Sequence, residues 1–457
     1  LPAPRGPFRS EISDCESCPL PSYWAIHGKG RQVGVADGRR QDGAQASRQG
    51  GEGHPARRSS TRGRTSKGLA AKGLGLLLAM GLLAGCAGRP GPDVLQPTDA
   101  TVPGAKQETI LVASTRERDA RPGTFYNGER APLSFATVDM SVPPTHQPGA
   151  IEWPKNGVGN PATDMVVREA AYIDSKQQFV ADLKAALAKR PKGQKIVFIF
   201  VHGYNTQFSE ALYRFSQMAV DSDSTAVPLL FTWASRAKTE AYVYDNNSAT
   251  IARDALEETI RLALASNAER VSIMAHSMGN WVTVEALRQM RMAGELKSQG
   301  HRIGNVILAA PDIDVDVFKS QLRRFGKPER PFVIIVSRDD KALGFSNLIA
   351  GGKTRVGAYA NDEELVDMGA VVVDMTDVKA LDEFNHGKFA QLAEIAPQMR
   401  AIVSRQVTAI QGSTPQSTAP AAVEVEKVKV FGLNRIFGTS SAAASVLSDA
   451  PPAPAAQ

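Results

Sequence analysis

The sequence predicts an α/β fold with a doubly wound, mostly parallel sheet and helices on both of its faces. Short apolar runs alternate with longer segments of helical periodicity between residues 108 and 411, and this alternation is typical of parallel sheets. The run 196–201 is apolar at every position, as expected for a central strand buried on both faces. Another run, 271–275, ends near a serine and is followed by a helical pattern.

The other elements follow from the same periodicities. In the segment 174–189, apolar residues recur at Phe179, Leu183 and Leu187, which would share one face of a helix. There is no internal repeat, and the pattern fits one large domain. Strands are predicted at 109–113, 133–142, 196–201, 227–233, 271–275, 303–310, 332–336 and 371–374, and helices at 174–189, 209–220, 248–265, 281–290 and 388–404.

The charge of the chain is unevenly distributed. Its 457 residues include 53 Lys and Arg against 47 Asp and Glu, and residues 1–85 hold 13 of the former and 6 of the latter. The net positive charge therefore belongs to the N-terminal segment, and the rest of the chain is nearly neutral. No nucleic-acid partner is implied for the main domain.

Residues 1–66 do not resemble a folded domain. They are rich in Gly, Arg, Gln and Ser and lack a periodic apolar pattern, so we expect a disordered leader. An alternative is that this leader is not natural protein, because the first methionine is Met80, inside an apolar run. Cys15 and Cys18 have C-x-x-C spacing without a second pair, which we attribute to chance.

Residues 67–85 have the pattern of a secretion signal. Lys67 and Lys72 precede an apolar run at 74–83 that is too short to span a bilayer. The sequence Leu-Ala-Gly-Cys at 83–86 resembles a bacterial lipobox, and this resemblance implies a lipidated Cys86 at the mature N-terminus. A short membrane anchor or an ordinary cleaved signal is the alternative. We expect a lipid-anchored protein of the cell envelope, on the periplasmic face of the outer membrane.

Two further segments flank the predicted domain at 108–411. Residues 86–107 contain several Pro and Gly residues and are predicted to form a tether. Residues 412–457 are rich in Ala, Pro, Ser and Thr, and we expect a disordered tail in which only 423–437 is apolar enough to dock. No cysteine follows Cys86, so the domain contains no disulfide.

The stretch 271–280 has the features of a nucleophile elbow. An apolar strand leads to Ser277, and a helical pattern follows. Small residues, Ala275 and Gly279, stand two positions before and after the serine and let the strand and helix approach closely. The pattern is A-x-S-x-G rather than G-x-S-x-G. A serine that only caps a helix is the alternative.

Acyl transfer also needs a base, an acid and donors for an oxyanion. His386 follows the last predicted strand and is the candidate base; Asp340 follows the strand before it and is the candidate acid. The order Ser277, Asp340, His386 matches that of α/β hydrolases. Other carboxylates remain as alternatives to Asp340, namely Asp339, Asp312 and Asp314.

The candidate oxyanion donors are the backbone N–H groups of Met278 and of the turn after strand 196–201, in particular Tyr204. The other histidines near strand ends, His202 and His276, are expected to have structural roles, and His301 is expected at the surface. Trp233 ends a strand and either lines the pocket or is buried.

These motifs resemble a bacterial α/β-hydrolase family whose members are known as esterase/lipase-superfamily proteins of unknown function. The resemblance covers residues 108–405 and includes Ala113-Ser114-Thr115-Arg116, the residues 202–205, 275–280, 310–314 and 340–343. It implies an α/β-hydrolase fold with Ser277, Asp340 and His386 as a catalytic triad. The substrate of the family is not established.

The sequence thus predicts a serine hydrolase that cleaves carboxylic esters through an acyl-enzyme intermediate, on a small ester or acyl substrate and without metal or cofactor. One alternative is a catalytically idle binding or scaffold protein of the envelope, which the presence of Ser, Asp and His in the required order disfavours. Another is an acyltransferase or peptidase with the same triad. Oligomeric state and substrate identity are not predicted.

Overall fold

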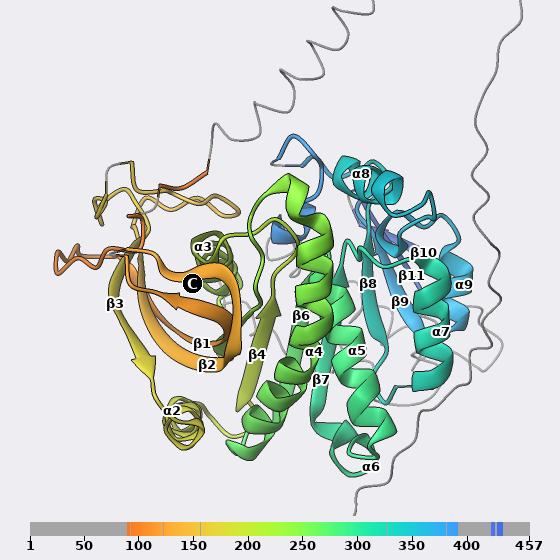
Figure 1. Cartoon of the computed structure of the whole chain (residues 1–457), viewed down its shortest axis with the longest axis horizontal. Coiled ribbons are helices and arrows are strands. Elements are labelled where there is room, and N and C mark those ends of the chain that lie inside the picture. The colour runs from red at the N-terminus through yellow and green to blue at the C-terminus, as the bar shows by residue number, and fades with distance from the viewer. Residues whose placement is uncertain are drawn as a thin grey trace, which may run out of the picture. The chain divides into compact units, whose positions relative to one another are not determined.

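The computed structural model describes residues 89–391, except for 92, 122, 156, 327 and 381, together with 422–425 and 427–432. In these residues the strands form one 11-stranded sheet with the order β10-β11-β9-β8-β7-β6-β4-β5-β1-β2-β3 (Figure 1). The strands are β1 (Lys106–Asp119), β2 (Phe125–Val142), β3 (Val166–Ile173), β4 (Ile196–Val201), β5 (Val227–Thr232), β6 (Arg270–His276), β7 (Ile303–Ala309), β8 (Phe332–Val336), β9 (Ala370–Asp374), β10 (Ala422–Val425) and β11 (Val428–Phe431).

The middle of the sheet is parallel and its two ends are antiparallel. Every neighbouring pair from β1 through β5, β4, β6, β7 and β8 to β9 is parallel. The pairs β1–β2 and β2–β3 at one end are antiparallel, as are β9–β11 and β11–β10 at the other. All carboxyl ends of the central strands therefore meet at one edge of the sheet, where α/β folds bind their ligands.

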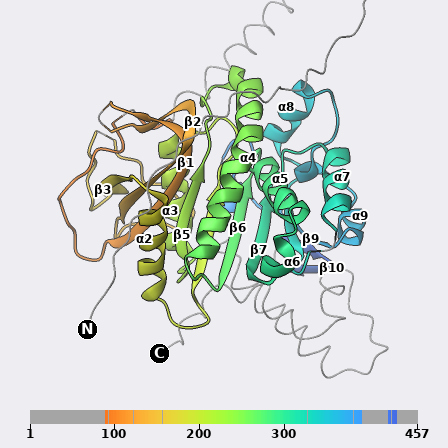
Figure 2. The ribbon, with the colours of Figure 1, turned by 60° about the horizontal axis from the view of Figure 1, so that its bottom comes forward.

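Helices cover both faces of the sheet. Figure 2 shows α2, α4, α5 and α7 in a row on one face. Helix α3 packs on the other face, where Phe215 stacks on Phe200 of β4 with 5.4 Å between the ring centroids. The helices are α2 (Lys176–Ala188), α3 (Phe208–Asp221), α4 (Tyr242–Ala265), α5 (Gly279–Met292), α6 (Leu296–Gln299), α7 (Val315–Phe325), α8 (Lys341–Ile349) and α9 (Asp362–Asp367), with 3-10 turns at Thr239–Ala241, Gly300–Arg302, Val356–Ala358 and Lys388–Gln391.

Each face of the sheet has its own hydrophobic core. Leu256 of α4 and Val282 of α5 are fully buried in one core together with Ile273 of β6. The second core lies under α3 and includes Met274, the next residue of the same strand. Because neighbouring side chains of a strand point to opposite faces, this arrangement explains why β4 is apolar at every position.

The architecture matches the predicted fold class, and β4 and β8 have the predicted bounds. The sequence prediction missed β3, because Arg168 and Glu169 interrupt its apolar pattern. It also placed the start of α4 too late, at 248 instead of Tyr242. The predicted helix 388–404 begins as a 3-10 turn, and its continuation lies outside the described residues.

Part of the predicted tether packs against the domain. Val94 and Leu95 are each 5% exposed and belong to the core under α3. The hydroxyl of Tyr213 on α3 donates a 2.8 Å hydrogen bond to the carbonyl of Val94. The segment from Arg89 onward is therefore docked rather than a free spacer, because it contributes apolar side chains to the core.

Part of the predicted tail joins the sheet. In β11, Val428 and Val430 are buried, and the strand pairs with β9. The leader 1–66, the signal segment 67–85 and Cys86 lie outside the described residues. None of the helices in the described part of the chain is long and apolar enough to cross a membrane.

Candidate active site

The candidate residues of the domain lie at the carboxyl edge of the parallel sheet. Tyr204 follows β4, Ser277 follows β6 and Asp340 follows β8, and His386 stands in the loop after β9. Residues that are far apart in the sequence are thus brought to the same edge by the parallel arrangement of their strands.

Ser277 occupies a strained turn between β6 and α5. Its φ angle is 53°, in the left-handed region that residues with a side chain seldom adopt. Neighbouring groups fix this conformation. The Ser277 N–H donates to the Ala309 carbonyl at 3.0 Å, and the Ser277 carbonyl accepts bonds from the backbone N–H groups of Asn280 and Asp312 at 3.1 and 3.2 Å. The Asn280 side-chain amide donates a third bond to that carbonyl at 2.8 Å.

Two glycines allow this turn to lie close to the loop after β4. A Cβ atom on Gly279 would lie 2.7 Å from the carbonyl oxygen of Val201 and even closer to that of His202. A Cβ atom on Gly203 would lie 2.7 Å from the Cβ of Ser277. Both separations are too short for real contacts, so the absence of a side chain at these positions lets the two loops meet.

Asp340 and His386 form a hydrogen-bonded pair. The Nδ1 atom of His386 lies 2.7 Å from Oδ2 of Asp340, whose side chain is fully buried. Since a carboxylate is an acceptor, Nδ1 carries the hydrogen, and Nε2 is left to accept a proton. The His386 ring lies beside the elbow, because its centroid is 4.5 Å from that of His276, the residue before Ser277.

The other predicted carboxylates have different partners. Asp339 forms an ion pair with Lys388 at 2.7 Å and accepts a bond from Asn385. Asp312 lies 3.2 Å from Nε of Arg355 and also bonds to Ser346. Asp314 caps α7, where it accepts bonds from two backbone N–H groups. Of the four carboxylates, only Asp340 is hydrogen-bonded to the imidazole.

The surroundings of His386 raise its pKa. Burial acts in the opposite direction, because it disfavours the charged imidazolium. The hydrogen bond and negative charge of Asp340 outweigh it, with smaller contributions from the charges of Asp312 and Asp382, so that the pKa of His386 lies above its usual range. The imidazole therefore gains affinity for a proton from the same carboxylate that orients it.

Two backbone N–H groups, one in the turn after β4 and one in the elbow, are the candidate oxyanion donors. Within the described part of the chain, the N–H groups of Met278 and Tyr204 have no hydrogen-bond acceptor. The turn is held by Asp245 of α4, which is fully buried and accepts a 3.2 Å bond from the Asn205 N–H. Asn205 itself has a φ angle of 57°, so this turn is also strained.

His202 supports that turn from inside the protein. Its Nδ1 atom lies 2.8 Å from the Gly203 carbonyl and therefore carries the hydrogen. Its Nε2 atom accepts bonds from the Trp233 N–H at 3.1 Å and from Arg116 at 3.2 Å. Burial and the charge of Arg116 hold the pKa of His202 well below its usual range. His202 is thus a neutral, structural histidine, as expected.

The remaining predicted residues also have defined places. Trp233 is fully buried and stacks on His202, with its indole N–H donating to the His202 carbonyl at 2.8 Å. His276 stacks on Phe389 and its Nε2 donates to the His386 carbonyl at 3.2 Å. Burial, and then the charge of His386, lower the pKa of His276. His301 is exposed.

The sequence analysis missed two residues that hold the His386 loop. Asp382 accepts bonds from the backbone N–H groups of His386 at 3.0 Å and Gly387 at 2.7 Å. Lys388 is 2% exposed and donates to Asp339 and to the Met375 carbonyl. An aspartate three residues before Asn-His-Gly is a composition typical of a turn closed by a side chain, and this signal could have identified the loop.

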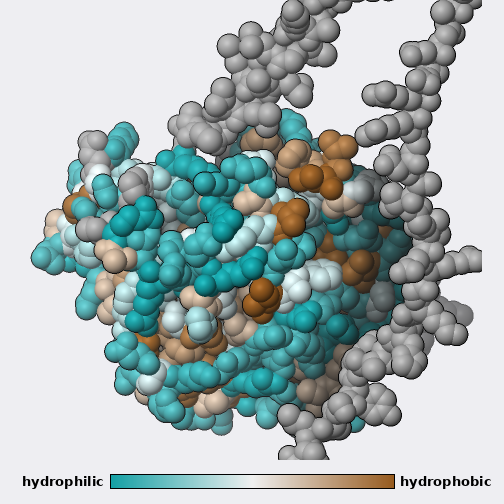
Figure 3. Space-filling model, viewed as in Figure 1, coloured by the Kyte–Doolittle hydropathy of each residue, from teal (hydrophilic) through white to brown (hydrophobic). Residues whose placement is uncertain are grey.

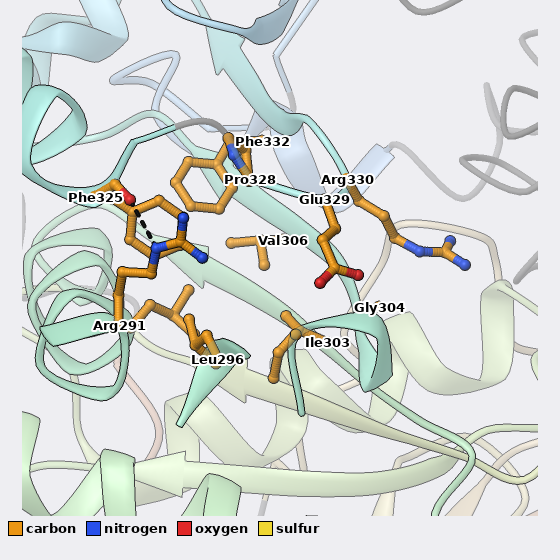
Figure 4. A pocket seen from close by; sticks show the side chains of 12 residues that line it. Arg291, Leu296, Ile303, Gly304, Val306, Phe325, Pro328, Glu329, Arg330 and Phe332 are labelled. Atoms are coloured by element: carbon orange, nitrogen blue, oxygen red, sulfur yellow. Dashed lines mark hydrogen bonds between the residues drawn. The ribbon is translucent and has the colours of Figure 1, made fainter. Parts of the chain in front are cut away.

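Two cavities lie away from Ser277. One cavity, of about 30 Å³, lies at the amino edge of the sheet. Among its lining residues, Arg291 donates a 3.0 Å bond to the Phe325 carbonyl (Figure 4). Its volume suits a water molecule or two. A cavity of about 280 Å³ is lined by Leu95, Phe208 and Arg116 among others. The guanidinium of Arg116 already bonds to backbone and side-chain acceptors there.

No group of three or more His, Cys, Asp or Glu side chains in the described residues is arranged to hold a metal ion.

The parallel sheet with helices on both faces and a strand–serine–helix turn defines the chain as an α/β hydrolase. Residues 175–405 match the family described as alpha/beta hydrolase of unknown function (DUF900), and the chain belongs to this family. No curated protein matches the chain.

Proposed function

We propose that the protein is a serine hydrolase that cleaves carboxylic esters, with Ser277 as nucleophile, His386 as base and Asp340 as the acid that orients the base. The observation that carries this proposal is the position of Ser277 on a turn with a φ of 53°, directly after His276, whose ring lies 4.5 Å from that of His386. The Nδ1 atom of His386 in turn lies 2.7 Å from the buried carboxylate of Asp340. The family supports a hydrolase of some kind.

In the proposed reaction, Nε2 of His386 takes the proton of the Ser277 hydroxyl while Oγ attacks the ester carbonyl carbon. The N–H groups of Met278 and Tyr204 stabilise the negative charge that develops on the carbonyl oxygen. The tetrahedral intermediate then expels the alcohol, which takes the proton from His386. Water repeats the sequence on the acyl-enzyme and releases the carboxylic acid with the serine restored.

Chemical labelling tests the nucleophile directly. The purified protein is treated with a fluorophosphonate probe, and the labelled peptide is identified by mass spectrometry. We expect the label on Ser277 and no label in Ser277→Ala. Labelling of another serine, or no label together with no turnover of short p-nitrophenyl esters, would refute the proposal and favour an idle scaffold.

We also propose that Cys86 is lipidated and that the domain is held in the cell envelope, on the periplasmic face of the outer membrane. The support is the order of positive charge, apolar run and Leu-Ala-Gly-Cys at 67–86. Metabolic labelling with a fatty acid should mark the wild-type protein and not Cys86→Ser. A label that persists in the variant would contradict a lipid anchor at this residue.

A further inference from the structure

We infer that the edge of the sheet that carries Ser277 is a membrane-docking surface, and that it presents the serine to acyl esters of the bilayer. This inference rests on the proposed serine hydrolase and its lipid anchor, and it names the class of substrate: an ester whose acyl chain lies in a membrane rather than in water.

The first observation is an apolar rim, which we define as Val243, Phe345, Leu348, Ile349 and Phe384. These side chains are exposed by 71, 43, 78, 48 and 53%, respectively. Figure 3 shows apolar side chains gathered over α8, which carries the middle three. Large exposed apolar side chains that cluster in this way mark an interaction site more often than a free surface.

The rim adjoins the proposed acid and the proposed base. Helix α8 begins directly after Asp340, and Phe384 stands two residues before His386. The backbone carbonyl of Phe384 accepts a 2.9 Å bond from the Lys341 N–H at the start of α8. The helix start and the His386 loop are therefore joined at this edge.

The start of α4 connects the rim to the turn after β4. Tyr242 precedes Val243, and its hydroxyl lies 3.0 Å from Oγ of Ser346 on α8. The Tyr242 ring also packs against that of Tyr204, with 5.1 Å between the centroids. The start of α4 thus touches Tyr204, which carries a proposed oxyanion donor. The other two rim segments, α8 and the loop with Phe384, adjoin the proposed acid and the proposed base.

The second observation is the place where the chain from the proposed anchor reaches the domain. The Arg89 guanidinium donates to the Asn205 carbonyl at 2.7 Å and to the Asn205 side chain at 2.9 Å. It also lies 3.5 Å from Glu210. Arg89 is therefore fixed on the same turn that carries the Tyr204 N–H.

Cys86 precedes Arg89 by three residues, which span at most about 11 Å. A lipid on Cys86 would hold the backbone of Arg89 within that reach of the bilayer, and the Arg89 side chain contacts the turn at 202–205. In the alternative interpretation, 74–83 stays in the membrane, and the six residues from Leu83 to Arg89 span at most about 22 Å. The chain thus ties to the membrane the same edge that carries the apolar rim.

A lipid bilayer is the occupant that accounts for both observations. Apolar side chains on a surface helix insert at the boundary of headgroups and acyl chains, and α8 presents three of them beside the proposed acid. A second copy of the chain or a protein partner could cover the rim. Neither a second copy nor a protein partner would explain why the chain from the anchor reaches the domain at the turn 202–205.

Depth measurement in vesicles tests the docking. The full chain is produced in cells as the lipidated protein and reconstituted in phosphatidylcholine vesicles, with Leu348→Cys or, as control, Met292→Cys labelled by a fluorescent maleimide. Met292 is 54% exposed at the end of α5, next to α6 at the opposite edge of the sheet (Figure 1). We expect doxyl lipids to quench the dye at position 348 at least twofold more than the dye at 292. Equal quenching, or stronger quenching at 292, would overturn the inference.

Activity on two forms of ester tests the substrate class. The ratio of turnover of a long-chain ester in vesicles to turnover of p-nitrophenyl butyrate in water should fall at least tenfold in Leu348→Asp/Ile349→Asp and stay at the wild-type value in Met292→Asp. An unchanged ratio in the double variant would overturn the inference. The inference would also be overturned if the wild-type protein self-associates in solution and the double variant does not, since the rim would then bind a second copy of the chain. If the wild type cleaves neither ester, the proposed hydrolase fails, while the quenching still decides the docking.

Discussion

The buried carboxylate of Asp340 accepts hydrogen bonds from two different parts of the protein. Its Oδ2 atom lies 2.7 Å from Nδ1 of His386, and its Oδ1 atom accepts a 2.9 Å bond from the backbone N–H of Leu343. The second bond caps the N-terminus of α8, where negative charge is stabilised. The helix therefore fixes the carboxylate, and the carboxylate fixes the tautomer of the imidazole.

Substitution of the two neighbouring aspartates should separate their roles. Asp340→Asn should lower kcat roughly a thousandfold or more, because an amide favours the wrong tautomer of His386 and cannot stabilise the imidazolium. Asp339→Asn should have a much smaller effect, because Asp339 binds Lys388 rather than the imidazole. Turnover of p-nitrophenyl butyrate measures both. Equal losses, or a larger loss in Asp339→Asn, would contradict the assignment of the acid.

The pH dependence of the reaction should report the raised pKa of His386. Only the neutral imidazole can take the serine proton, so kcat/KM should rise with pH through a pKa above that of an ordinary histidine, about 6.5. The residual activity of Asp340→Asn should show a lower pKa, because the carboxylate that outweighs the burial of His386 is gone. A profile that is flat between pH 5 and 9 would exclude His386 as the base.

The sequence was most informative where the chain is regular. The apolar run 196–201 predicted β4 with its observed bounds, because burial on both faces leaves no polar position. The strand–serine–helix pattern likewise predicted the place of Ser277. Which of Asp339 and Asp340 bonds to His386 depends on the direction in which each side chain points. The sequence of a loop does not reveal that direction for two adjacent residues.

Contacts between distant segments were also beyond the reach of the sequence pattern. Arg89 lies in a stretch rich in Pro and Gly, and nothing in that composition indicates its bonds to Asn205. The stretch 423–437 was expected to be apolar enough to dock, but its composition does not indicate that β11 pairs with β9, which depends on the free edge of the sheet. Such docking is decided by the folded surface rather than by local periodicity.

The close approach at Gly279 should make this position intolerant of a side chain. In Gly279→Ala, the new Cβ would meet the backbone carbonyls of Val201 and His202, which cannot move aside as a flexible side chain can. We expect a loss of about 1–3 kcal/mol in the free energy of unfolding. Gly344→Ala is the matched control, because a Cβ there meets nothing within 4 Å and a helix gains about 0.5–1 kcal/mol from alanine. Urea denaturation measures both, and a stable Gly279→Ala would show that the loops can separate.

His146 should make the stability of the domain depend on pH. Its Nδ1 lies 2.8 Å from Glu152 and its Nε2 lies 2.8 Å from Asp221. Burial opposes the charge of the ring, but hydrogen bonds to the two carboxylates outweigh it and raise the pKa of His146.

A raised pKa in the folded state means that the stabilisation is complete below the ordinary pKa of histidine and is lost as the pH rises through the folded value. At pH 5, His146→Gln should therefore lower the free energy of unfolding more than the control His301→Gln does. At pH 9, this difference between the two variants should be smaller. A difference that is the same at both values would show that the ion pairs contribute no pH dependence.

The proposed nucleophile and base should act as one unit. Ser277→Ala should lower kcat by a factor on the order of 10⁴ to 10⁶, because the remaining activity comes only from the oxyanion donors and substrate binding. His386→Ala should cause a similar loss, because without the base the hydroxyl keeps its proton. The double variant should lose little more than either single variant, since each change already disables the same step. The measurement is turnover of p-nitrophenyl acetate and butyrate by all four proteins, with circular dichroism to show that each is folded. Losses that multiply in the double variant would mean that the two residues contribute independently, and full activity of Ser277→Ala would refute the nucleophile itself.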